Sequence, residues 1–212
     1  MLESYNVGSL LFKDARVVYY RSSRYPSQVG GHNTMAIVWT LQHPRVLDSL
    51  ERGEAYRPKL SAVEKYGMID YPKLQHAYEW MREQYSKRVK PLSPGHGLVW
   101  VWVRPKPDLR GWAREEKPFV RLTLQVDPKR ILPSDHEDWH SPLNGSPVTP
   151  LRLRNLPDRL FDKWADEAYM WPPPKIEKTW TRIFDPRYFR PHVQGVMSEI
   201  RPGDVVKTER FD

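Results

Sequence analysis

Three stretches of the chain carry the side-chain pattern of β-strands. In residues 119–126 (FVRLTLQV) the aliphatic side chains fall on one face, and Arg121, Thr123 and Gln125 fall on the other. Residues 36–42 (AIVWTLQ) are rich in β-branched and aromatic side chains, which favour an extended backbone. Residues 98–103 (LVWVWV) are apolar on both faces, so we expect this third strand in the centre of a sheet.

A helical period predicts the longest helix over residues 72–88, with Pro72 in its first turn. The stripe that this helix buries consists of Leu74, Ala77, Tyr78, Met81 and Tyr85. His76 lies off the stripe and is expected at the surface. Shorter helices are predicted over residues 46–50, closed by Gly53, over 160–170, stopped by the prolines at 172–174, and over 179–184.

The end of the chain reads as two further strands, residues 192–200 and 205–211, joined by a turn at 201–204 as an antiparallel pair. The order of elements predicts a single α+β domain over residues 34–212, with two to four helices and a sheet that is antiparallel, mixed or split. Residues 1–33 are basic and rich in turn residues, which predicts an N-terminal extension or arm.

Composition narrows the classes of function. The 34 Lys and Arg against 26 Asp and Glu give a net charge of +8, which favours a nucleic acid or another polyanion as partner. The basic residues are spread evenly, however, and a generally basic surface explains them equally well. The absence of cysteine excludes disulfides and thiolate chemistry. No apolar window approaches the ~20 residues of a membrane span, so we expect a cytoplasmic protein without a membrane partner.

Polar and aromatic side chains crowd into residues 134–144. The group comprises Ser134, Asp135, His136, Asp138, Trp139, His140 and Asn144. Histidine and carboxylate ligate divalent metals, but no third, distant ligand and no clear helix carrying H-x-x-x-H is evident, so no metal is expected. The alternative is structural, with Ser134 and Asp135 capping a turn and Trp139 packing. Nucleophile-elbow, P-loop and dinucleotide-binding glycine motifs are absent.

An ordered set of short motifs resembles a bacterial family that is known as domain of unknown function 3841. The set consists of Trp39-Thr40-Leu41-Gln42, Ala77-Tyr78-Glu79-Trp80-Met81, Val99-Trp100-Val101-Trp102, Ile131-Leu132-Pro133-Ser134-Asp135, Trp139-His140, Leu143-Asn144, Thr179-Trp180, Ile183-Phe184-Asp185 and Val193-Gln194. The likeness covers residues 36–211. His136 and Glu137 depart from it, because the family has Phe after the aspartate.

A second resemblance, in architecture, is to ADP-ribosyltransferases, which bind NAD in a split sheet and use a polar residue of the first strand with a late Glu or Gln. It implies NAD as cofactor, with Gln42, His140 and Gln194 in catalytic positions. The cofactor-binding positions that it implies are Trp39, Thr40, Trp100, Trp102, Asp135, Trp139 and Asn144. Glu199 is the alternative to Gln194. The His-Tyr-Glu and Arg-Ser-Glu sets of these enzymes are absent, and a glutamine orients but cannot act as a base.

Two alternatives belong to other classes of protein. One is a non-catalytic nucleic-acid-binding module in which tryptophans stack on bases and arginines contact phosphates. Its phosphate-binding positions are Arg21, Arg24, Arg104, Lys106 and Arg110. The other is a protein that binds a partner protein through the N-terminal arm.

Overall fold

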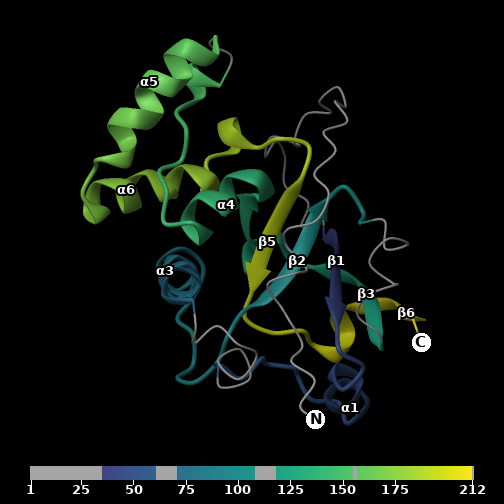
Figure 1. The fold of residues 1–212 in the computed structure, drawn as a ribbon. Coiled ribbons are helices and arrows are strands. Elements are labelled where there is room, and N and C mark those ends of the chain that lie inside the picture. The colour runs from purple at the N-terminus through teal and green to yellow at the C-terminus, as the bar shows by residue number, and fades with distance from the viewer. Residues whose placement is uncertain (1–34, 61–70, 108–117, 155–156, 212) are drawn as a thin grey trace, which may run out of the picture.

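The computed structural model describes residues 35–60, 71–107, 118–154 and 157–211. Its strands are β1 (Ala36–Gln42), β2 (Val99–Arg104), β3 (Phe119–Val126), β4 (Leu132–Asp135), β5 (Val193–Met197) and β6 (Val205–Phe211). They form one sheet in the order β4-β5-β2-β1-β3-β6, in which every neighbouring pair is antiparallel (Figure 1). The predicted α+β class with an antiparallel sheet is confirmed, and β2 is central as expected.

Five α-helices occur in the described ranges, one more than the predicted maximum of four. They are α1 (Val46–Glu51), α3 (Pro72–Arg88), α4 (His136–Leu143), α5 (Asp158–Tyr169) and α6 (Pro173–Trp180). The predicted helix over 72–88 is confirmed at both ends, and Gly53 (φ 76°) follows α1 as expected. The helix predicted over 179–184 is wrong in its start, because α6 begins at Pro173 and residues 181–184 continue it as a 3₁₀ turn.

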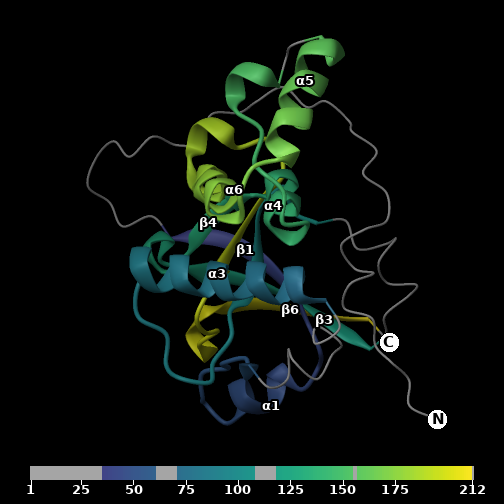
Figure 2. The ribbon, with the colours of Figure 1, turned by 60° about the vertical axis from the view of Figure 1, so that its left-hand side comes forward.

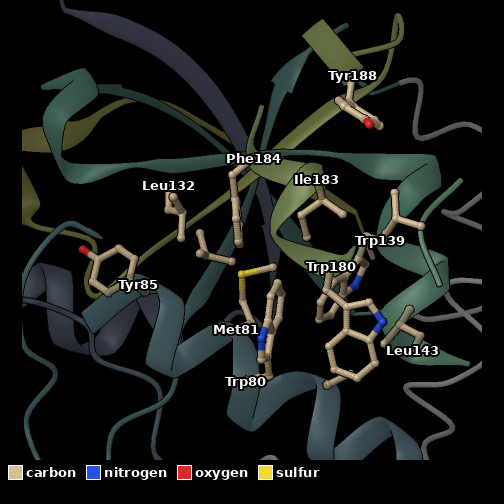
Figure 3. Close-up of a cluster of buried hydrophobic side chains, with 13 residues drawn as sticks. Trp80, Met81, Tyr85, Leu132, Trp139, Leu143, Trp180, Ile183, Phe184 and Tyr188 are labelled. Carbon is tan, nitrogen blue, oxygen red and sulfur yellow. The ribbon is translucent and has the colours of Figure 1, made fainter. Parts of the chain in front are cut away.

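The two faces of the sheet bury separate apolar clusters. One face carries Val38, Val101, Leu122 and Leu124, which pack with Val46 of α1. Across the β5, β4 and β2 end of the other face lie α3, α4 and α6 (Figures 1 and 2). Figure 3 shows this second cluster, in which side chains of α3, β4, α4 and α6 meet. Both views show α5 projecting beyond the sheet.

The sheet opens between its two central strands. β1 pairs with β3 along its whole length, from Ala36 to Gln42, but with β2 it pairs only at Trp39↔Trp102. Beyond that pair the Thr40 hydroxyl donates a hydrogen bond to the Trp100 carbonyl oxygen at 2.7 Å. A side chain thus replaces the backbone ladder where β1 and β2 diverge.

The final strand was predicted to pair with the strand before it, and this is wrong. β5 already lies between β2 and β4, so it has no free edge, whereas β3 has one, and β6 pairs there. Between β5 and β6 the chain runs along the lower end of the sheet in Figure 1 and reaches the edge at β3. Arg130 holds this crossing through two hydrogen bonds, 2.6 and 2.8 Å, to the buried Asp204 carboxylate.

The contact between β3 and β6 predicts an acid-sensitive stability. Nε and Nη2 of Arg121 each donate a hydrogen bond to the Glu209 carboxylate at 2.8 Å, and these bonds, with Lys207, lower the pKa of Glu209 to about 2. A carboxyl group with a lowered folded-state pKa contributes stability above its unfolded pKa and loses it as the pH falls. The free energy of unfolding of wild type should therefore drop more steeply than that of Glu209→Gln between pH 4.5 and 2.

Urea unfolding at four pH values over that range measures this difference. Glu83→Gln is the matched control, because Glu83 pairs with Lys87 on the exposed surface of α3. Parallel stability curves for wild type and Glu209→Gln would refute the proposed role of the Arg121–Glu209 pair.

Candidate functional site

The polar stretch at 134–144, which sequence analysis treated as a turn or loop, folds as the end of β4 and the whole of α4. Asp135 is the N-cap, and its side chain accepts a hydrogen bond from the Asp138 backbone N–H at 2.8 Å. Glu137 and Asp138 lie in the first turn, where negative charge is favourable. Pro133 and Pro142 concealed these elements, since proline is unusual in both strands and helices.

Two buried carboxylates lie under the start of α4, and arginines from later in the chain bind them. Arg190 donates from its backbone to Asp135 at 2.6 Å, and from its side chain to Asp135 at 2.7 Å and to Asp138 at 2.5 Å. Arg154 donates to the other oxygen of Asp138. This arginine–carboxylate network ties α4 to the segments that precede α5 and β5.

Burial disfavours the charged forms of Asp138 and Arg190 in this network. It raises the pKa of Asp138 to about 6, although Arg190 and Arg154 act in the opposite direction and Asp135 adds to the increase. Burial also disfavours the charged form of Arg190, but the hydrogen bond to Asp135 and the negative charges of Asp135, Asp138 and Glu137 together outweigh it, so the pKa of Arg190 is raised. The network therefore pairs two buried carboxylates with arginines that reach the surface, since the Arg190 side chain is 39% exposed.

Three histidines lie close together at α4: His136 in its first turn, His140 in its last turn and His192 from the segment before β5. The ring centroids of His136 and His140 are 5.3 Å apart, and those of His136 and His192 are 6.4 Å apart. His140 Nδ1 lies 3.1 Å from the Glu137 carbonyl oxygen, and His192 Nδ1 lies 2.7 Å from the Glu137 carboxylate. Although His136 and His140 are spaced by four on a helix, the described ranges contain no group of three or more metal-ligating side chains arranged to hold an ion.

His136 is the histidine closest to the predicted site residues of the sheet. Its Nδ1 lies 3.1 Å from Gln194 Oε1, and since an amide oxygen only accepts, Nδ1 carries the hydrogen. Nε2 is then the nitrogen that can accept a proton. Burial lowers the pKa of His136, more than the hydrogen bond to Gln194 raises it, so the ring is neutral at pH 7. The ring centroid lies 4.8 Å from that of Trp102.

The strand register aligns these side chains in one row across the sheet. Ser134 pairs with Gln194, Gln194 with Trp102, Trp102 with Trp39, and Trp39 with Thr123. Directly paired residues of antiparallel strands point to the same face. Gln194 is buried, and its Nε2 has no hydrogen-bond partner among the described residues. The row therefore combines two partly exposed indole rings with a buried amide, and the neutral imidazole of His136 in α4 lies beside it.

Other predicted site residues lie elsewhere. Thr40 and Gln42 point to the α1 face with Val38, because alternate residues of β1 share a face. There the Gln42 amide donates to the Thr40 hydroxyl at 2.8 Å. Glu199, near the other end of β5, is buried and ion-paired with Arg57 and Arg201.

Three of the predicted cofactor-binding residues make contacts that stabilise the fold. Trp139 is buried between Tyr78 and Trp100, at centroid distances of 5.8 and 5.1 Å. Asp135 binds Arg190, and Asn144 follows the last turn of α4 and donates to the His140 carbonyl oxygen at 2.8 Å. Of the predicted catalytic residues, His140 and Gln194 thus lie on either side of His136, while Gln42 lies on the opposite face.

The predicted phosphate-binding residues are only partly described. Arg104 ends β2 and is partly exposed, and Lys106 follows it and is exposed. Arg21, Arg24 and Arg110 lie outside the described residues, as does the N-terminal extension. Sequence analysis missed Arg154, Arg190 and His192 as members of the site, since nothing local links them to residues 134–144.

The fold and site define an α+β protein in which a helix start, held by buried arginine–carboxylate pairs, meets a face of an antiparallel sheet. The chain belongs to the family described as domain of unknown function DUF3841, whose family model matches residues 37–149, more than half of the 212 residues. The match spans β1 to α4 and does not include Arg190 or Gln194. Neither a curated protein nor a solved structure matches the chain. None of the described helices is long and apolar enough to cross a membrane.

Proposed function

We propose that this protein is an ADP-ribosyltransferase-like enzyme that binds NAD against Trp39 and Trp102 and modifies a nucleic-acid or protein acceptor. The observation that carries the proposal is the position of His136, which is hydrogen-bonded to Gln194 and packed against Trp102, next to the single residue pair that joins β1 to β2. A proton acceptor on α4 thus lies beside an amide and an aromatic surface on the sheet.

Trp39 and Trp102 supply the surface for binding. Their paired positions on adjacent strands give two partly exposed indole rings on one face, and flat heteroaromatic rings such as nicotinamide stack on such surfaces. Lys106, exposed just beyond β2, offers a cation for the diphosphate. Gln194 is buried, so we assign it to positioning His136 rather than to contact with the ligand.

His136 is the residue that we assign to proton transfer. In the proposed step the bond between nicotinamide and the ribose carbon breaks, and its electron pair goes to the nicotinamide ring. An acceptor oxygen or nitrogen bonds to that ribose carbon, and its proton passes to Nε2 of His136. Gln194 cannot take a proton, so its role is to hold the imidazole with Nε2 available. This assignment replaces His140 by its neighbour one helical turn earlier.

Calorimetry with NAD, together with an assay of nicotinamide release, tests the proposal. At a hundredfold excess over the dissociation constant, NAD should stabilise the wild type by about 2.7 kcal/mol, a shift of several degrees. Trp102→Ala should abolish binding. His136→Gln, which keeps a donor toward Gln194, should bind NAD but release nicotinamide about 10²–10⁴ times more slowly.

Matched controls separate this site from general effects. Trp164→Ala removes a partly exposed tryptophan of α5, and His76→Gln removes an exposed histidine of α3; both should behave as wild type. The absence of any NAD binding by the wild type would refute the proposal. Binding without an effect of His136→Gln on turnover would refute only the role of His136.

The Trp39–Trp102 face also supports a second candidate function, the binding of single-stranded nucleic acid. Stacking of bases on tryptophan tolerates any sequence, and the net charge of +8 favours a polyanion. An oligonucleotide that binds without NAD, with affinity falling steeply as salt rises and lost in Trp102→Ala, would favour this function over the enzyme.

A further inference from the structure

The free side of β6 is a second feature with the chemistry of a binding surface. β6 is the last strand of the sheet and pairs with β3, and within the described residues no strand lies along its other side. Val206 is 52% exposed, and Lys207, Thr208 and Arg210 are exposed as well. An edge strand presents unpaired backbone N–H and C=O groups, to which another strand can add.

We propose that two copies of this chain associate through β6, as an antiparallel pair with Thr208 on the two-fold axis. In this register Lys207 lies opposite Glu209 of the partner subunit, and the same contact recurs on the other side of the axis. Moving the axis to Lys207 or to Glu209 would instead place like charges opposite each other, which is unfavourable. Of these three registers, the charges of β6 favour the one centred on Thr208, in which Lys207 and Glu209, ion-paired at 3.1 Å within each chain, face the opposite charges of the partner subunit.

The apolar surface beside β6 extends this contact. Val206 comes opposite Arg210 of the partner subunit, whose aliphatic stem can cover it. Arg210 also lines a groove of about 410 Å³ between α1 and β6, together with Leu47, Leu50 and Val205. Two short strands alone bury less area than a stable interface requires, so the apolar rim of this groove is part of the proposed contact.

Single cysteines test the register, because the natural chain has none. Directly opposed Cα atoms in an antiparallel pair lie about 4.5–5.5 Å apart, within the range that a disulfide spans. Thr208→Cys should form a disulfide-linked dimer under mild oxidation. Val206→Cys, exposed on the same strand but opposite Arg210, should cross-link about tenfold more slowly or not at all. Equal rates for the two variants would overturn the register.

Charge reversal tests the association itself, by sedimentation of the full chain at low salt. The wild type should be dimeric, and Lys207→Glu should weaken the dimer about tenfold, since two symmetric contacts become repulsive. Glu209→Lys should do the same, with circular dichroism checking that the loss of its pair with Arg121 leaves the chain folded. A mixture of the two variants restores opposite charges at both contacts and should recover the wild-type dissociation constant.

A wild type that stays monomeric over its soluble concentration range would overturn the proposal. So would a dimer that neither charge variant weakens. The inference does not rest on the proposed enzymatic function. β6 forms one edge of the sheet, whereas His136 follows β4 at the opposite edge.

Discussion

Asp135→Ala is expected to lower the free energy of unfolding by about 3–5 kcal/mol, because it removes a helix cap together with several charge-assisted hydrogen bonds to a partly exposed arginine. Asp135 is fully buried, caps α4, and accepts bonds from the backbone and side chain of Arg190. Its removal leaves Arg190 without its main partner. Asp138 then remains as the buried carboxylate between Arg190 and Arg154. Equilibrium unfolding in urea measures the difference.

Asp127→Ala is the matched control. Asp127 also precedes a helical turn and accepts a hydrogen bond from the Lys129 backbone N–H at 2.9 Å, but it binds no arginine of the described segments. Its loss should cost about 1 kcal/mol, the usual value of a cap. If the two variants lost equal stability, the arginine contacts of Asp135 would contribute nothing and its capping role would explain the whole effect.

Trp139→Ala is the second change with a large expected effect, about 3–5 kcal/mol of lost stability, because it removes a fully buried indole and leaves a cavity. The side chain lies in the cluster of Figure 3, with Tyr78 and Trp100 against it. Sequence analysis placed this residue among the NAD ligands. Its burial instead predicts that it contributes to stability and that it does not touch a ligand.

The same unfolding experiment separates these roles. Trp139→Phe keeps most of the apolar volume and should lose much less stability than Trp139→Ala. Trp164→Ala, on the projecting helix α5, should change stability little. If Trp139→Ala kept wild-type stability but no longer bound NAD, Trp139 would instead be a residue that contacts NAD.

The large cost expected at Asp135 has a functional consequence. The arginine–carboxylate network fixes the first turn of α4, and that turn carries His136 to Gln194 and Trp102. Activity lost in Asp135 variants is therefore expected to accompany lost stability, whereas Trp102→Ala should separate the two. Comparing both measurements for each variant distinguishes residues that hold the site in place from those that meet a ligand.

The sequence by itself determined the elements whose side chains repeat with a clear period. The alternation at 119–126, the β-branched and aromatic run at 36–42, the doubly apolar run at 98–103 and the stripe of 72–88 predicted β3, β1, β2 and α3. Local periodicity sufficed there because each element buries one face, or two, against a core, and burial selects for that period. The α+β class followed from the order of these elements.

Tertiary structure alone decided which strands pair and which polar side chains meet. β6 joined β3 because β5 was already enclosed, and Arg190 reached Asp135 from 55 positions away along the chain. The Gln194–His136 bond depends in the same way on β5 lying beside β4. Such contacts depend on which edges and buried charges remain unpaired once the sheet is assembled, and no local pattern in the sequence records that.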